Sequence, residues 1–305
     1  MKRTALVTLF LMVVCFAVPS FAAPALVVIC NAPGPLSKIN NVLKLLNPAG
    51  PNTLVISGTC KENIVIQGFD RLTLVAKPGA VLTDASGGQQ WAVVLILDSR
   101  RVSIQGFTIS GGNVGVSCDD YSLCRLRGNT FDGTAQRGVD VNNSELTLSG
   151  DVIQNGSYIG LYVNASNVQA SNVTIQANSN GISAAGSTVT LTGVSIHNNT
   201  SDGVFVNSSA KLQLIDSNVS FNSGNGITVA DLTDVSMVND TVTGNGQFGV
   251  WFGDESVGFF VGGSYRANGY LDISCGGQYS LAKNIAGIYG TTDCPVPQAA
   301  SSRVR

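Results

Sequence analysis

The sequence has few charged side chains and no strong excess of either sign. Charged residues make up 12% of its 305 residues, about half the usual share, with 17 Lys and Arg against 19 Asp and Glu. This composition leaves no basic face for nucleic acid and no polybasic patch for anionic lipid. Asn, Ser, Thr and Gly build the polar surface instead, which suits a hydroxyl-rich ligand. We therefore expect no nucleic-acid partner.

The sequence also has few residues that bind metals. His197 is the single histidine, and no pair of cysteines has the CxxC spacing, so a metal site is not expected. Six cysteines follow the N-terminal segment, and an even number in an exported chain favours disulfides. Six cysteines allow fifteen connectivities. Their order along the chain suggests the pairs Cys30 with Cys60, Cys118 with Cys124, and Cys275 with Cys294.

A long apolar run occurs only at the N-terminus. Residues 1–22 combine a basic start, an apolar run from Ala5 to Val18 and a small-x-small cleavage site at Ser20 to Ala22. This pattern predicts a secretory signal peptide, because the apolar run is too short to span a bilayer comfortably. We expect no membrane span and a protein that is secreted or periplasmic after cleavage.

Glycine recurs about every 22 residues through the middle of the chain, and short apolar alternations follow most of these glycines. The glycines are Gly115, Gly138, Gly160, Gly181, Gly203, Gly226 and Gly249. Alternation is the period of a β-strand, and each repeat has room for three short strands with turns between them. Such a repeat buries its apolar face only against the repeats on either side, which predicts a solenoid.

Asparagines recur in the turns with nearly the same period. They are Asn155, Asn178, Asn199, Asn222, Asn245 and Asn268. Asparagine suits tight turns, and side-chain amides stacked on successive turns can hydrogen-bond to each other. We interpret these six residues as structural.

The N-terminal part of the mature chain has one predicted helix, followed by strands. Ser37 can cap a helix whose apolar stripe runs from Ile39 to Leu46, and strands are predicted at 54–56, 64–66 and 72–75. This order, with the Gly and Asn repeats behind it, resembles the right-handed parallel β-helix proteins of the pectate-lyase-like superfamily. The superfamily includes lyases, hydrolases, epimerases, tailspikes and inert surface proteins, so the resemblance implies a fold but no single activity.

The expected architecture is one all-β domain, a right-handed parallel β-helix of about nine turns. Its handedness follows from the resemblance and from the general preference for right-handed crossovers. We divide the chain into a signal peptide (1–22), an N-terminal cap with the helix (23–63), the β-helix repeats (64–269), a C-terminal cap (270–297) and a disordered tail (298–305). The helix is expected to cover the open end of the solenoid.

Residues two and four positions after each glycine are expected to point outward on one face. The first of these two columns contains Tyr162, Phe205 and Trp251 on alternate turns, and the second contains Asn142, Asn164 and Asn207. Aromatic rings with neighbouring amides are suited to a sugar polymer, which needs apolar faces and hydrogen-bond partners. The sequence thus predicts a ligand-binding face, unless loops fold over it and bury the rings.

Charged residues concentrate between residues 119 and 151, and this band is the candidate catalytic region. Asp119 and Asp140 are expected one turn apart, where two carboxylates could divide the roles of acid and base, and Arg137 could neutralise a uronate. The pair Asp119 and Asp120 resembles the paired aspartates of polygalacturonase-like hydrolases. However, the other motifs of that family are absent from the following turns, as are those of pectate lyases and alginate epimerases. A solvated, salt-bridged surface is the alternative.

Three functional hypotheses follow. The first is a monomeric exported protein that binds a polysaccharide or cell-surface glycan along the aromatic face without catalysis. The second is a polysaccharide lyase, hydrolase or epimerase that uses the charged band. The third is a structural or adhesive rod. No cofactor is expected, and calcium is considered only if the protein is a lyase.

Overall fold

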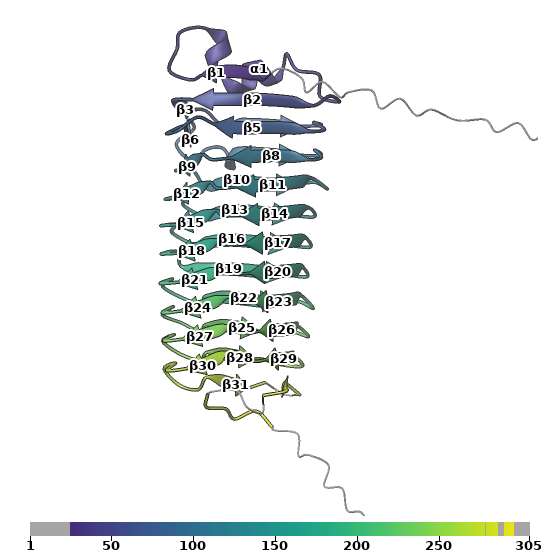
Figure 1. Ribbon diagram of the computed structural model, residues 1–305, viewed down its shortest axis with the longest axis vertical. Coiled ribbons are helices and arrows are strands. Elements are labelled where there is room, and N and C mark those ends of the chain that lie inside the picture. The colour runs from purple at the N-terminus through teal and green to yellow at the C-terminus, as the bar shows by residue number, and fades with distance from the viewer. Residues whose placement is uncertain (1–24, 278, 286–289, 296–305) are drawn as a thin grey trace, which may run out of the picture.

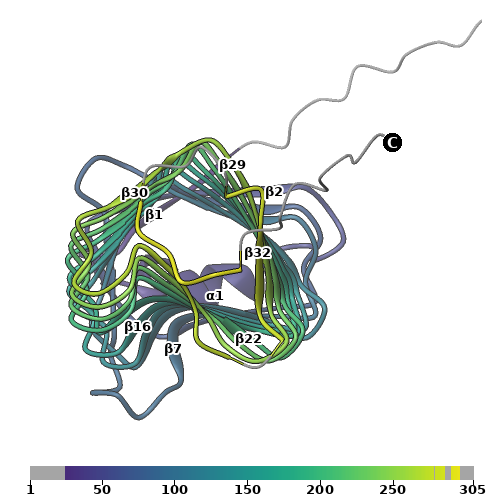
Figure 2. The same cartoon turned by 90° about the horizontal axis from the view of Figure 1, so that it is seen from below.

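The computed structural model describes residues 25–277, 279–285 and 290–295. The expected signal peptide and tail lie outside these residues. Three parallel sheets form a right-handed solenoid of about ten turns, close to the nine predicted (Figure 1). Viewed along its axis, the solenoid has three faces, one for each sheet (Figure 2). The all-β parallel β-helix prediction is confirmed.

We call the three sheets A, B and C, and each turn of the solenoid contributes one strand to each of them. Sheet A contains twelve strands: β1 (Leu26–Ile29), β2 (Asn52–Ser57), β5 (Leu72–Ala76), β8 (Val102–Gln105), β11 (Leu123–Arg127), β14 (Glu145–Ser149), β17 (Asn167–Ser171), β20 (Thr188–Thr192), β23 (Lys211–Ile215), β26 (Asp234–Val238), β29 (Val257–Val261) and β32 (Leu281–Lys283). Sheet B contains ten short strands: β3 (Thr59–Lys61), β6 (Val81–Thr83), β9 (Thr108–Ser110), β12 (Thr130–Asp132), β15 (Val152–Gln154), β18 (Thr174–Gln176), β21 (Ser195–His197), β24 (Asn218–Ser220), β27 (Thr241–Thr243) and β30 (Ser264–Arg266).

Sheet C also contains ten strands. They are β4 (Ile64–Gln67), β7 (Ala92–Leu97), β10 (Val114–Asp119), β13 (Arg137–Asn142), β16 (Ile159–Asn164), β19 (Asn180–Ala185), β22 (Val204–Asn207), β25 (Ile227–Val229), β28 (Val250–Phe252) and β31 (Ile273–Cys275). The strands β31 and β32 follow residue 269 and pair in parallel with β28 and β29. Parallel pairing therefore continues into the segment that was expected to form the C-terminal cap.

The repeating glycines lie where the chain enters sheet C and leave no room for a side chain. A Cβ placed on Gly160 would lie 2.7 Å from the carbonyl oxygen of Gly181 and 2.7 Å from Cγ2 of Ile175. Adjacent turns therefore approach each other closely at this corner. Inward side chains beside the glycines, such as Leu161 and Ile182, are fully buried and fill the core.

The asparagine ladder forms, but with five members rather than six. The Asn178 side chain donates to Oδ1 of Asn199 at 3.3 Å, and the same contact repeats to Asn222, Asn245 and Asn268 at 2.8 to 3.0 Å. Asn155 was predicted to belong to this ladder, and that part of the prediction is wrong. Its exposed side chain donates to Asp132 instead, at 2.7 Å.

The N-terminal helix covers the end of the solenoid but is shorter than predicted (Figures 1 and 2). It consists of η1 (Pro35–Ser37) and α1 (Ile39–Leu43). Ser37 does not cap α1, because its hydroxyl donates to the Gly34 carbonyl at 2.6 Å. The Glu62 carboxylate accepts the first helical amides instead, from Ile39 at 2.6 Å and from Asn40 at 3.2 Å.

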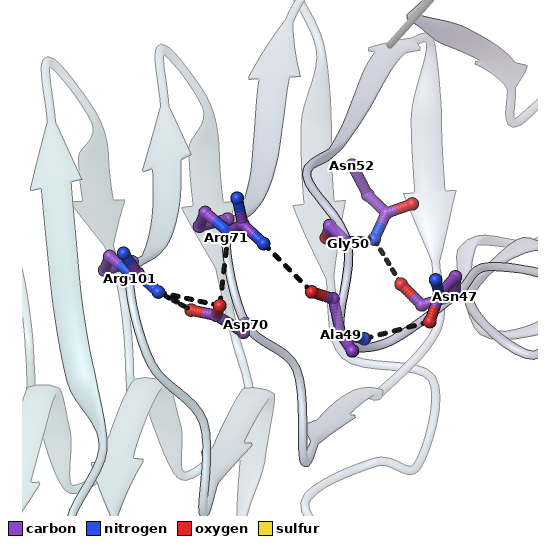
Figure 3. Close-up of polar contacts among 7 residues, drawn as sticks. All are labelled: Asn47, Ala49, Gly50, Asn52, Asp70, Arg71 and Arg101. Atoms are coloured by element: carbon purple, nitrogen blue, oxygen red, sulfur yellow. Dashed lines mark hydrogen bonds and ion pairs between the residues drawn. The ribbon is translucent and has the colours of Figure 1, made fainter. Parts of the chain in front are cut away.

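Polar side chains join the segment after α1 to the first turns (Figure 3). Arg71 donates to the carbonyl of Ala49 at 3.0 Å, and Asp70 accepts from both Arg71 and Arg101. These contacts connect the cap to two successive turns of sheet A.

The three disulfides pair as predicted, Cys30–Cys60, Cys118–Cys124 and Cys275–Cys294. Cys118 is the second-last residue of β10 in sheet C and Cys124 lies in sheet A, with both side chains facing the core. Between them Asp120 and Tyr121 adopt positive φ angles of 53° and 61°, and Tyr121 is 82% exposed. This bridge therefore braces one corner of the solenoid.

Candidate functional site

The outer face of sheet C carries the two side-chain columns predicted from the glycine spacing. Parallel pairing places the first column in register on successive strands as Ser117, Asp140, Tyr162, Ser183, Phe205, Thr228 and Trp251. The second column contains Asn142, Asn164, Ala185 and Asn207 in register. The residues chosen as ligand-binding therefore share one face. The aromatic rings of Tyr162, Phe205 and Trp251 are only partly exposed.

Arg137 is the centre of a compact cluster at the N-terminal end of this face. Its Nη1 donates to both carboxylate oxygens of Asp140 at 2.9 Å. Its guanidinium carbon lies 3.7 Å from the centre of the Tyr162 ring and 5.5 Å from that of Trp91. One face of the Tyr162 ring is thus covered by a cation, so this ring is a less open platform than the sequence suggested.

Ser117 connects the two carboxylates that were predicted to lie close together. Its hydroxyl donates to Asp119 at 2.7 Å and lies 3.5 Å from Oδ2 of Asp140. Asn142 donates to the other oxygen of Asp119 at 2.9 Å, and Trp91 donates through Nε1 to Ser117 at 3.2 Å. The three candidate catalytic residues and Asn142 therefore belong to one hydrogen-bonded group.

The two aspartates differ in environment. Burial raises the pKa of Asp140; the Arg137 guanidinium opposes this shift and the charge of Asp119 adds to it. The Asp140 side chain is fully buried, and that of Arg137 is 21% exposed. Asp119 is only partly buried. Asp119 is therefore the carboxylate that solvent or a ligand can reach.

Further along the same face, Phe205 lines a groove of about 340 Å³. The other lining residues are Tyr158, Ile159, Asn180, Ser183, Ser201 and Asp202. Ile159 lies on β16, the strand that also carries Tyr162, so the groove adjoins the Arg137 cluster and extends to Phe205 two strands further on. Trp251 lies on the second strand beyond Phe205, roughly 10 Å away at ~4.8 Å per strand.

Sequence reasoning missed Trp91, Tyr158 and Asp202. Each lies in or beside a turn that leads into sheet C, outside the two outward positions of the strand. Trp91 directly precedes β7, and its carbonyl accepts the amide of Val114. Inspection of the turn residues just before each strand of sheet C could therefore have identified these three side chains from the sequence.

The residues described do not provide a metal-binding group. No set of three or more His, Cys, Asp or Glu side chains converges within 25–277, 279–285 and 290–295. All six cysteines among the described residues are in disulfides, and the ring of His197 contacts the side chain of Asn198. In the same part of the chain, no helix has the length and apolar character needed to cross a membrane.

Two protein-family models match parts of the chain. Residues 159–270 match the right-handed β-helix region, and residues 58–200 match the periplasmic copper-binding protein NosD. The described residues do not fit a copper site, because their cysteines are in disulfides and no cluster of donor side chains converges. No curated protein sequence matches the chain significantly.

Solved structures with a similar fold include a phage tailspike domain and enzymes named for alginate and pectate. The enzymatically active domain of tailspike protein 2 from bacteriophage CBA120 matches with a TM-score of 0.56 at 13% identity, over 90% of this chain and 47% of the tailspike chain. A mutant of the periplasmic alginate epimerase AlgG matches with a TM-score of 0.52 at 12% identity, over 80% of this chain and 81% of the epimerase.

Pectate lyase Pel9A gives a TM-score of 0.49 at 14% identity, over 80% of this chain and 70% of the lyase. At these identities the tailspike and AlgG matches, whose TM-scores exceed 0.5, show a likeness of fold alone. The matched repeats and the three parallel sheets agree on one assignment. The described part of the chain is a right-handed parallel β-helix built from repeats.

Proposed function

We propose that the protein is exported and, as a monomer, binds an extended polysaccharide along the outer face of sheet C without cleaving it. The binding face runs from Trp91 to Trp251 along the axis of the solenoid. A parallel β-helix presents such a face as a straight row of equally spaced side chains, which is suited to a polymer with a regular repeat.

The observation that carries this proposal is the continuity of the face. The Trp91–Arg137–Tyr162 cluster, the groove containing Phe205 and the strand of Trp251 follow one another in register. Aromatic rings supply apolar surface for sugar rings, and polar groups beside them fix orientation. A row of partly exposed rings on one sheet face is costly unless it contacts a ligand.

The second column offers amides that are available to a ligand. The side chains of Asn164 and Asn207 point outward and make no hydrogen bond to another residue in the part of the chain that is described. An amide supplies both donors and an acceptor, which match the hydroxyls of a sugar. Three disulfides and the match to a periplasmic family support export.

Catalysis by Asp119, Asp140 and Arg137 is the second candidate function. It is favoured by the Ser117 hydroxyl, which lies between the two carboxylates. The geometry favours binding over catalysis, because Asp140 is fully buried and both of its oxygens already accept from Arg137. A general acid or base must be able to reach the proton that it transfers.

The test is electrophoretic retardation in gels that contain uronic-acid or neutral polysaccharides, together with assays for reducing ends and for ultraviolet absorbance. We expect retardation by at least one polysaccharide and no product. Phe205→Ala and Trp251→Ala are each expected to weaken binding about tenfold, because each removes a ring from the face.

Val65→Ala is the matched control. Val65 is 47% exposed and belongs to the same register of sheet C, two strands before Ser117. Its loss should leave binding unchanged. Product formation that Asp119→Asn abolishes would establish catalysis instead, and no retardation by any polysaccharide would leave the structural-rod hypothesis.

A further inference from the structure

The outer face of sheet A carries a groove that the proposed function does not use. It has a volume of about 450 Å³ and lies over β20, β23, β26, β29 and β32. Five strands at ~4.8 Å spacing give it a length of roughly 19 Å along the axis. Sheet A and sheet C form different faces of the solenoid (Figure 2), so this groove is separate from the face that contains Tyr162 and Phe205.

One column of side chains runs along this groove. Parallel pairing places Thr190, Gln213, Ser236, Phe259 and Lys283 in register on its five strands. Along the column, three hydroxyl and amide side chains are therefore followed by the Phe259 ring and then by the Lys283 ammonium. Phe259 is 46% exposed, although aromatic rings in stable proteins are usually buried.

The two lysines of the groove form no ion pair with another residue in the described part of the chain. The ion pairs found among the described residues involve only Asp70 with Arg71 and Arg101, and Asp140 with Arg137. Lys211 and Lys283 line the groove and form none of these pairs. Asp234 is in register with Lys211, so the groove has two cations and one carboxylate. Lys283 is on the strand beside Phe259 and has no acidic neighbour in the groove's own column.

We propose that this groove is a second saccharide site, which takes a short stretch of an acidic polysaccharide. One sugar ring packs on Phe259, and its carboxylate interacts with the Lys283 ammonium. Thr190, Gln213 and Ser236 hydrogen-bond the hydroxyls of the sugars that follow. The inference rests on the proposed function for the class of ligand, but it assigns a different face and a charge preference.

The experiment is calorimetric titration of the full mature chain with a hexamer of uronic acid, and with a neutral hexamer of glucose for comparison. We expect two uronate hexamers per chain for the wild type. Phe259→Ala and Phe205→Ala should each bind only one hexamer tightly, with the altered site weakened about tenfold, and the double variant should bind none tightly. Lys283→Gln should weaken uronate binding at the second site at least threefold.

Val261→Ala is the matched control, because Val261 is 41% exposed on the same strand as Phe259 but does not line the groove. It should bind two hexamers like the wild type. Thermal unfolding of each variant checks that it remains folded.

The outcomes separate the inference from the proposed function. If Phe259→Ala still binds like the wild type while Phe205→Ala binds nothing, the sheet A site is overturned and the sheet C face stands. If Phe259→Ala binds nothing while Phe205→Ala is unaffected, the sheet C face is wrong and the groove stands. Equal binding of the neutral hexamer would overturn the charge preference, and no binding of either hexamer would overturn both proposals.

Discussion

The guanidinium carbon of Arg137 lies 3.7 Å from the ring centre of Tyr162, on the neighbouring strand. The same guanidinium donates to both oxygens of the buried Asp140. Arginine can make both contacts because its planar fork stacks through its face and donates through its edge. One side chain therefore fixes a carboxylate and an aromatic ring relative to each other.

Removal of Arg137 should destabilise the protein. Arg137→Ala leaves the Asp140 carboxylate buried without its counter-charge, and we expect a loss of about 3 kcal/mol in the free energy of unfolding at neutral pH. Urea unfolding measures this. Arg125→Ala is the control, because Arg125 is exposed on sheet A, and its effect should stay within about 0.5 kcal/mol. Equal stability of the two variants would contradict the prediction.

We expect Asp240 to make the free energy of unfolding depend on pH. Burial is the main cause that raises its pKa from 3.8 to about 6, although the amides of Ser217 and Val238 donate to its oxygens. The folded state therefore holds this proton more tightly than the unfolded state does. The contribution to stability is present in full below pH 3.8 and is lost as the pH rises through 6.

The loss amounts to about 2 to 3 kcal/mol between pH 4 and pH 7.5, since one unit of pKa corresponds to about 1.4 kcal/mol. Urea unfolding of the wild type and of Asp240→Asn at both pH values isolates this residue, because other groups cancel in the comparison. The advantage of the wild type over the variant should shrink as the pH rises. A difference that does not change with pH would be evidence against this role.

Tyr265 offers a simple stabilising substitution. Its ring is fully buried and packs edge-on against Phe260, with centroids 5.3 Å apart, but its hydroxyl has no hydrogen-bond partner among the described residues. Tyr265→Phe keeps the ring and removes an unsatisfied polar group. We expect a gain of about 1 kcal/mol in unfolding free energy. Tyr158→Phe, at a 52% exposed position, should change nothing, and a destabilised Tyr265→Phe would show that the hydroxyl has a partner.

The asparagine ladder should be sensitive to the loss of one member. Asn222 donates to Asn245 at 3.0 Å and accepts from the backbone and side chain of Asn199 at 3.1 and 2.8 Å. Asn222→Ala leaves buried groups on two turns without partners, and we expect a loss of about 3 kcal/mol. Thermal unfolding should show this, whereas Asn167→Ala at an exposed strand position should behave like the wild type.

The sequence predicted the register of sheet C because its period is strong. A glycine is required where turns approach closely, so Gly138 and Gly160 fix the outward positions that Asp140 and Tyr162 occupy. The disulfide pairs also followed from order along the chain. Most of the fold was therefore predictable from the regular spacing of residues in the sequence.

Contacts that depend on a single side chain were not predictable in this way. The α1 helix is capped by Glu62, which lies 23 residues after Ile39, and no local motif marks that contact. Asn155 has the period of the ladder, yet it adopts a φ of 57° and its side chain bonds to Asp132. The Arg137 stack on Tyr162 runs diagonally between strands and depends on the rotamers of both residues.

The close contact of successive turns at the glycine corner also determines how the molecule can grow. Each repeat of about 22 residues adds one position to every outer column and about 4.8 Å to every face. Duplication or deletion of one such repeat would therefore change the length of the proposed polysaccharide-binding face in fixed steps and leave the chemistry of the remaining positions unaltered. The number of repeats encoded in the gene would therefore fix the length of ligand that the proposed face can hold.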